Sequence, residues 1–151
     1  MENDISQLDS SIAAILETLP PVWDRIRSNL RFAATNKFGI TLDQFHTLRH
    51  IRKGYAHVGE LAEKRQVSRS AISQSIVALE AKGLIARRQE SGDRRLVKLE
   101  LTEFAARVLD ENYEENRLWM KSRMKSLPAS ELLLIEDAMK ALGAIFARDG
   151  K

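Results

Sequence analysis

Side chains suited to contacting nucleic acid recur between residues 69 and 95. Ser70, Ser73, Gln74 and Val77 supply small hydroxyls, an amide and a methyl-bearing side chain, spaced at helical intervals. Such groups contact the edges of bases and the methyl group of thymine in the major groove of DNA. None of the four is acidic, so a helix face carrying them would not repel phosphates. The pattern predicts a helix face that reads DNA bases.

Basic side chains follow this segment in a short stretch. They are Arg87, Arg88, Arg94, Arg95 and Lys98, accompanied by the acidic residues Glu90 and Asp93. Guanidinium groups bind phosphates and are attracted to the negative potential of the minor groove. We expect Arg87 and Arg88, together with Arg69, to hold phosphates, and Arg94 and Arg95 to enter the minor groove with Asp93 orienting one of them. A solvated basic hairpin is the alternative interpretation.

The positive charge of the chain is concentrated in the same region. The 151 residues include 24 Lys or Arg and 21 Asp or Glu, which gives a net charge of +3. Residues 41–102 hold 12 basic and 7 acidic residues, whereas the rest of the chain holds 12 and 14. A positive block in a nearly neutral chain is typical of a protein that binds a polyanion, although a solvated basic face has the same appearance.

Three histidines raise the question of a metal site. His46 and His50 are four residues apart, which places them on one face of a helix, and His57 follows. The chain has no cysteine and no HExxH motif, and Asp43 is the one carboxylate nearby at helical spacing. We therefore predict no metal and no cofactor. The histidines are interpreted as residues of a polar face or as contacts of a small ligand.

Aromatic and basic residues elsewhere could line a ligand pocket. Trp23 and Trp119 could pack against a planar ligand, although residues of this type at helical spacing also form ordinary cores. Arg49 could meet a ligand carboxylate, a phosphate or an acidic side chain in a salt bridge. The predicted ligand-pocket residues are Trp23, His46, Arg49, His50 and Trp119.

Composition excludes several other functions. A chain without cysteine has no disulfide, no thiolate metal site and no cysteine nucleophile. It also lacks a glycine-rich phosphate loop and a glycine-framed serine, so we predict that it is not an enzyme. The first ten residues are acidic and polar, and no stretch approaches the roughly 18 apolar residues of a membrane span. We expect a cytoplasmic protein without a membrane partner.

The elements that position these residues begin with two predicted helices. Apolar residues recur at helical spacing over residues 5–19, and Pro20-Pro21 should end that helix because proline lacks an N–H donor and clashes with the preceding turn. A second helix is predicted over 21–36, with Gly39 as its stop. The helix over 5–19 would then be an additional N-terminal element.

Three short helices are predicted next, over residues 42–51, 57–65 and 70–81. Thr41 and Ser68 are the expected N-caps of the first and the last of them. The helix over 70–81 should bury Ile72, Ile76 and Leu79 and present the opposite face. That outer face comprises Ser70, Ser73, Gln74, Val77 and Ala81. Its burial against another subunit is the alternative to DNA contact.

A hairpin and two long helices complete the chain. Residues 84–89 and 96–101 are predicted strands joined by a turn at 91–93. Thr102 should cap a helix that reaches about residue 125, and a last helix is predicted over 129–148. The expected fold class is mostly α with a small β-hairpin wing, formed by a winged helix-turn-helix lobe and a helical lobe.

The apolar stripes of the predicted helices over 21–36, 103–126 and 129–148 exceed what one small lobe can cover. A second copy of the chain would bury them, and a two-fold dimer is the commonest arrangement. We therefore predict a homodimer. Residues 1–40 and 103–151 would form the helical dimerisation region, and residues 41–102 the DNA-binding domain.

Five short segments between residues 58 and 102 have a characteristic order and spacing: Gly59-Glu60-Leu61-Ala62, Val67-Ser68, the run from Leu79 to Ile85, Asp93-Arg94-Arg95 and Leu101-Thr102. With them, residues 58–102 resemble the MarR family (multiple antibiotic resistance regulator) of bacterial transcriptional regulators. Each segment is weak by itself, but their order and spacing together are specific. The long helices on both sides extend the resemblance over most of the chain.

The resemblance implies a dimer that binds a double-stranded, pseudo-palindromic operator. Two recognition helices would enter successive major grooves about 34 Å apart, with the wings in the flanking minor grooves. It also implies a repressor of the bacterial or archaeal cytoplasm, released by a small aromatic or phenolic ligand bound between the dimer helices and the DNA-binding lobe. The alternatives are a DNA-binding regulator or architectural protein without an effector, and a winged-helix module that binds proteins.

Two features depart from the family pattern. His57 occupies an N-cap position where Ser or Thr is expected, and histidine is a poor cap. The predicted helix ended by Pro20 precedes the usual first helix and would swap across the dimer or cover the pocket. Both departures weaken the transfer of a ligand pocket to this chain, whereas neither affects the prediction of DNA binding.

Overall fold

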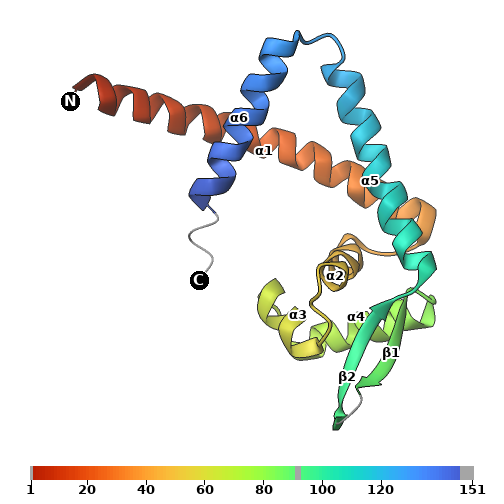
Figure 1. Cartoon of the computed structure of the whole chain (residues 1–151). Coiled ribbons are helices and arrows are strands. Elements are labelled where there is room, and N and C mark those ends of the chain that lie inside the picture. The colour runs from red at the N-terminus through yellow and green to blue at the C-terminus, as the bar shows by residue number, and fades with distance from the viewer. Residues whose placement is uncertain (1, 91–92, 147–151) are drawn as a thin grey trace. The chain divides into compact units, whose positions relative to one another are not determined.

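The computed structural model describes the backbone of residues 2–90 and 93–146 and the side chains of residues 5–89 and 97–146. Its elements are α1 (Glu2–Phe38), α2 (Leu42–Arg52), α3 (Val58–Arg65), α4 (Arg69–Ala81), β1 (Ile85–Glu90), β2 (Asp93–Leu101), α5 (Glu103–Met124) and α6 (Ala129–Phe146), as Figure 1 shows. The predicted fold class, mostly α with a β-hairpin, is confirmed. The chain divides into two compact units, residues 1–116 and 117–151.

The N-terminal helix differs from the prediction. α1 continues from Glu2 to Phe38 with Pro20 and Pro21 inside it, so the predicted break and the additional N-terminal helix are both wrong. The prolines deprive the carbonyls of Leu16 and Glu17 of their helical N–H partners. Both of these residues are exposed, so water can hydrogen bond to their carbonyls in place of the missing donors. The helix therefore passes through a site where a buried helix would break.

One hydrophobic core holds the first unit together. It joins the end of α1, the three short helices, the hairpin and the first half of α5. Its largest fully buried apolar side chains are Ile40, Leu48, Leu61, Ile72, Ile76, Leu79, Leu84, Val108 and Leu109. The predicted buried stripe of α4, which consists of Ile72, Ile76 and Leu79, is confirmed. Because these three side chains face the core, the opposite face of α4 lies on the surface.

Side-chain caps fix the ends of the helices where the sequence predicts them. Thr41 and Gln44 form a reciprocal capping box at the start of α2, with N···O distances of 3.0 and 3.1 Å. The Ser68 hydroxyl accepts a hydrogen bond from the Ala71 N–H at the start of α4. At the start of α5, the Thr102 hydroxyl accepts from the Ala105 N–H. All three predicted N-caps are therefore confirmed.

The two strands form an antiparallel hairpin. Ile85 lies opposite Leu101, Arg88 lies opposite Lys98, and the register shifts next to Gln89. β2 also connects to the segment before α3, because the Leu99 N–H donates to the Ala56 carbonyl at 2.8 Å. The hairpin is thus attached to the core at its base.

Two helices carry long exposed apolar surfaces. In the second unit, no described residue of α6 is buried, although its sequence includes Leu132, Leu133, Leu134, Ile135, Met139, Ile145 and Phe146. In the first unit, the first half of α1 exposes Ile5, Leu8, Ile12, Leu16, Leu19, Val22 and Trp23. Across residues 2–90 and 93–146, no helix is both long enough and apolar enough to span a membrane.

Candidate nucleic-acid interface

The outer face of α4 has the composition that the sequence predicts. Ser70, Ser73, Gln74, Val77 and Ala81 are all exposed, and Val77 exposes 57% of its surface. These five residues, together with Ala78, line a shallow hollow of about 430 Å³. The hollow contains no charged side chain, whereas the opposite face of the helix is entirely apolar and buried. The core therefore orients α4 so that its uncharged polar face is accessible to a large partner.

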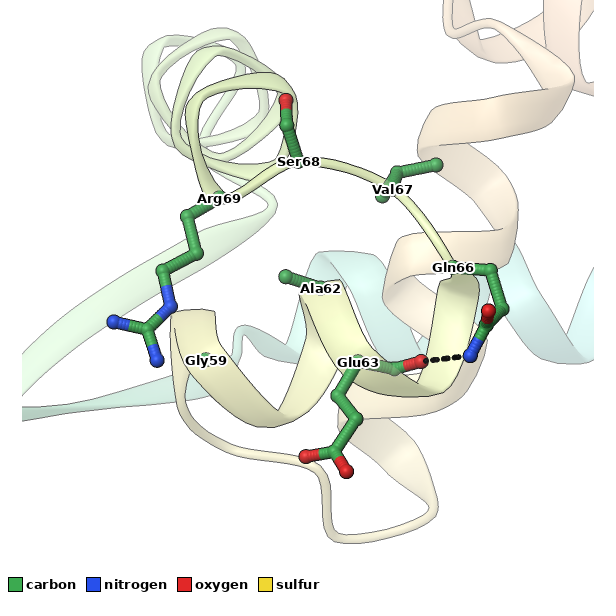
Figure 2. Close-up of a pocket in the computed structure, with 7 residues that line it drawn as sticks. All are labelled: Gly59, Ala62, Glu63, Gln66, Val67, Ser68 and Arg69. Atoms are coloured by element: carbon green, nitrogen blue, oxygen red, sulfur yellow. Dashed lines mark hydrogen bonds between the residues drawn. The ribbon is translucent and has the colours of Figure 1, made fainter.

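A tight turn joins α3 to α4 and sets the start of the outer face (Figure 2). Gln66 has a left-handed backbone (φ 54°), and its side chain donates a hydrogen bond to the Glu63 carbonyl at 3.2 Å. Figure 2 shows Arg69 extending from the first turn of α4 toward Gly59 at the start of α3. No described residue forms a hydrogen bond or ion pair with the Arg69 guanidinium. Arg69 is thus available to an external anion.

The start of α3 is capped by a residue that the sequence prediction overlooked. The Glu60 carboxylate accepts hydrogen bonds from the backbone N–H groups of His57 (3.1 Å) and Ala56 (3.0 Å). Its Oε2 also lies 3.2 Å from Nδ1 of His57. The side-chain hydrogen bond from His57, and then the backbone hydrogen bonds, hold the pKa of Glu60 below its ordinary value. An acid at the third helical position therefore compensates for the poor cap at His57.

Two arginines of the wing are paired with acids within the lobe. Arg87 Nε donates to Glu80 Oε2 of α4 at 3.0 Å, and Arg88 Nε lies 3.6 Å from Glu100 Oε2 on β2. Arg88 remains highly exposed, so a phosphate could compete for its guanidinium. The side chains of Asp93, Arg94 and Arg95 lie outside the described part of the structure. Their assignment to the minor groove stays a prediction.

Two contacts that the sequence did not predict hold the C-terminal end of α4. The ammonium group of Lys82 donates to the carbonyl of Gly39, just after α1. The Thr102 hydroxyl donates to the Gly83 carbonyl at 2.7 Å, which ties the end of β2 to the turn after α4. Both acceptors are backbone carbonyls, which no sequence pattern marks. These contacts fix the outer face of α4 relative to the end of α1 and the hairpin.

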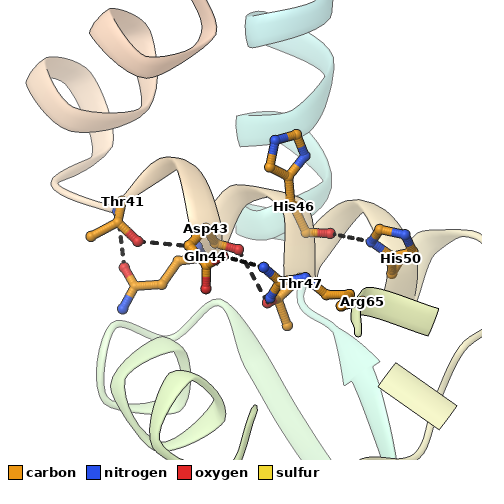
Figure 3. Close-up of polar contacts among 7 residues, drawn as sticks. All are labelled: Thr41, Asp43, Gln44, His46, Thr47, His50 and Arg65. Atoms are coloured by element: carbon orange, nitrogen blue, oxygen red, sulfur yellow. Dashed lines mark hydrogen bonds and ion pairs between the residues drawn. The ribbon is translucent and has the colours of Figure 1, made fainter. Parts of the chain in front are cut away.

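A polar network connects α2 to α3 (Figure 3). Arg65 is nearly buried, forms an ion pair with Asp43, and donates to the Thr47 hydroxyl at 2.5 Å. His46 lies beside this network. Its pKa is lowered, first by burial and then by repulsion from Arg49 and Arg65. The neutral imidazole is therefore favoured at this position.

The predicted ligand-pocket residues are only partly brought together. His46 and His50 are adjacent, with His50 Nδ1 2.8 Å from the His46 carbonyl oxygen, while Trp23 is half exposed on α1 and Trp119 belongs to the second unit. No described residue forms an ion pair with Arg49. The hollow beside His46, with a volume of about 430 Å³, is lined by Arg27, Arg31, Thr35, Thr41, Leu42, Asp43 and His46. The sequence prediction missed Arg27 and Arg31, although both lie one turn apart on α1.

The described residues contain no cluster of three or more His, Asp or Glu side chains that could hold a metal ion. What they do contain is a helix-turn-helix whose second helix exposes an uncharged hydrogen-bonding face, followed by a basic hairpin. This arrangement defines the winged helix-turn-helix class of DNA-binding proteins.

Comparisons with known proteins support the same class. Residues 38–96 match the MarR family model. The chain is 29% identical to the HTH-type transcriptional repressor MdtR of Bacillus subtilis over 126 residues, which cover 83% of this chain and 81% of MdtR. A MarR family protein from Bacillus stearothermophilus has the same fold, with a TM-score of 0.79, 24% identity and coverage of 92% and 97% of the two chains. FabT of Streptococcus pneumoniae, solved in complex with DNA, aligns with a TM-score of 0.75, 20% identity and coverage of 93% and 99%.

Residues 38–96 form a winged helix-turn-helix domain of the MarR family, and the chain as a whole is similar to transcriptional regulators of that family. It is a DNA-binding regulator of that type and not an enzyme. The resemblance detected in residues 58–102 is thereby confirmed, together with the prediction that the protein is not an enzyme.

Proposed function

We propose that this protein is a homodimeric repressor that binds a pseudo-palindromic operator and is released by a small aromatic or phenolic ligand. The observation that carries the proposal is the exposed face of α4, which presents hydroxyls, an amide and methyl groups without a charge. Ser70, Ser73, Gln74 and Val77 would contact bases, because their groups match the donors, acceptors and methyls of the major groove. The relative MdtR is named as a repressor, which favours repression over activation for this protein.

Basic residues around this face would hold the DNA backbone. Arg69 has no partner among the described residues, and Arg88 is highly exposed, so both can reach phosphates. Arg87 would contribute once DNA competes with Glu80 for its guanidinium. Arg94 and Arg95 would enter the minor groove, with Asp93 orienting one of them. Residues 41–102 would then form the DNA-binding domain.

The exposed apolar surfaces of α1 and α6 support the dimer. An 18-residue helix with no buried residue gains little from its own unit, and it exposes seven large apolar side chains. Apolar patches of this kind mark protein interfaces, and a second copy of the chain supplies the matching surface in a two-fold arrangement. Residues 1–40 and 103–151 would form that interface. Light scattering of the purified protein should give twice the 17.1 kDa mass of the chain, and a monomer would contradict the dimer.

A small ligand would bind at the hollow between α1 and α2. Arg27 and Arg31 have no partner among the described residues and could pair with a carboxylate or phenolate, while Leu42 provides an apolar contact. His46 on α2 would contact the ligand ring. A regulator without an effector is the alternative. A panel of benzoates and phenols should release DNA from the protein and not from the Arg31→Ala variant; release from neither would favour the alternative.

The central test is recovery of genomic DNA by the purified protein at about 150 mM salt, where mainly specific contacts survive. We expect an enriched palindrome whose half-site centres lie about ten base pairs apart. Gln74→Ala should then change the preferred base at one position, whereas Arg69→Ala should weaken all sequences alike. Recovery of unselected DNA would contradict sequence-specific regulation.

A further inference from the structure

The outer face of α4 restricts which bases it can read. Its charged residues lie near the two ends of the helix, at Arg69 and Glu80, and the residues between them are uncharged. Glu80 is paired with Arg87, and Lys82, just beyond the helix, donates to the Gly39 carbonyl. The surface between the two ends therefore has no ammonium or guanidinium group directed outward.

Guanine is the base that such a face reads least well. The commonest specific contact to guanine is a bidentate hydrogen bond from Arg or Lys to O6 and N7 in the major groove. Ser70 and Ser73 can accept or donate one hydrogen bond each, which does not distinguish the bases strongly. The centre of α4 consequently lacks the groups that select G·C pairs.

The same face carries groups that match adenine and thymine. The Gln74 amide can pair with N6 and N7 of adenine in a bidentate manner, and aliphatic side chains contact the C5-methyl group of thymine. Val77, Ala78 and Ala81 are the aliphatic residues that line the hollow, and Val77 is 57% exposed. Gln74 and Val77 are three residues apart, a rise of about 4.5 Å along the helix. That separation lets the two side chains reach neighbouring base pairs, which are about 3.4 Å apart along the DNA.

We infer that α4 reads an A·T-rich core in each half-site, with an adenine paired to Gln74 and a neighbouring thymine methyl packed against Val77. Ala78 and Ala81 leave the space that this methyl and its base occupy. The inference rests on the proposed function, since it requires that the outer face of α4 enters the major groove. It adds the chemical identity of the bases that this face selects.

Selection from a fully randomised duplex library, with full-length protein, is the first step of the test. We expect A·T pairs at the positions that change when Gln74→Ala or Val77→Ala replaces the wild type. Binding without any enriched sequence would contradict the proposed function itself, which requires sequence-specific binding. An enriched palindrome with G·C pairs at those positions would leave the proposed function intact and overturn this inference.

Base analogues then test the two contacts separately. Replacing the selected thymine with uracil removes one methyl group, which should weaken wild-type binding about fourfold. The same replacement should have no effect on the Val77→Ala variant. Replacing the selected adenine with 7-deazaadenine should weaken wild-type binding about fivefold and leave the Gln74→Ala variant unaffected.

Control duplexes carry the same analogues outside the half-sites, where we expect no change in affinity. Both side chains are exposed, so the variants should fold, which circular dichroism can verify. Equal losses for wild type and variant would overturn the inference, because the analogue would then act through a residue other than the one assigned.

Discussion

Arg87 Nε of β1 donates a hydrogen bond to Glu80 Oε2 of α4 at 3.0 Å. This contact joins the recognition helix to the wing, the two elements that would touch DNA together. Both side chains are about 40% exposed, so solvent screens the pair and its contribution to stability is under about 1 kcal/mol. Its consequence is electrostatic: it withholds one guanidinium from external anions and leaves a carboxylate beside the outer face of α4.

Replacing Glu80 with Gln should therefore strengthen binding to unselected DNA. A released Arg87 would add one phosphate contact, so the slope of log K against log salt should become steeper by about 0.9. Fluorescence anisotropy with a labelled duplex between about 50 and 200 mM salt measures that slope. Glu136→Gln is the matched control, since it removes the same charge from a pair with Lys140 on α6. Equal slopes for the two variants would contradict a specific role for Glu80.

Adjacent residues on α4 should differ sharply in their effect on stability. Ile76 is completely buried, so Ile76→Ala should lower the free energy of unfolding by about 2–5 kcal/mol through lost burial and a cavity. Val77→Ala, one residue later on the exposed face, should change it by less than about 0.5 kcal/mol. Urea unfolding followed by circular dichroism measures both values. Similar losses for the two variants would mean that α4 does not face the core as described.

The short helices of the first unit could be predicted because each carries local signals. Thr41, Ser68 and Thr102 are caps whose hydroxyls meet backbone N–H groups within three residues, so the sequence alone contains the whole interaction. The outer face of α4 could also be predicted from local sequence. Ile72, Ile76 and Leu79 recur at helical spacing, which fixes the buried face and therefore the residues opposite it.

The features that the sequence did not predict depend on solvent exposure or on contacts between residues that are far apart in the sequence. Pro20 and Pro21 ordinarily end a helix, yet α1 continues through them at a place where Leu16 and Glu17, the residues that lose their N–H donors, are exposed to water. The contact of Lys82 with Gly39 joins residues 43 positions apart and uses a backbone carbonyl, which has no signature in the sequence. Arg27 and Arg31 can be identified as lining residues of the hollow beside His46 only when the structure shows that α2 lies next to α1.

Thr102 should contribute more to stability than an ordinary cap. Its hydroxyl accepts from the Ala105 N–H at 3.1 Å and donates to the Gly83 carbonyl at 2.7 Å, so it joins three elements. Thr102→Val keeps the shape of the side chain and loses both hydrogen bonds, which should cost about 1–3 kcal/mol in the free energy of unfolding. Thr102→Ser retains the hydroxyl and should cost less than about 1 kcal/mol. A smaller loss for Thr102→Val than for Thr102→Ser would indicate that the methyl group, not the hydroxyl, is important.

His46 should make the stability of the protein depend on pH. Burial, followed by repulsion from Arg49 and Arg65, lowers its pKa in the folded state below the ordinary value of 6.5. Between the folded and unfolded pKa values the unfolded chain binds more protons, so this stabilising contribution is complete above pH 6.5 and is lost as the pH falls through the folded pKa. His46→Gln cannot be protonated, and the difference in unfolding free energy between wild type and variant should therefore fall as the pH drops below about 6.5. Urea unfolding at a series of pH values measures this difference, and a constant difference across the series would show that His46 titrates alike in both states.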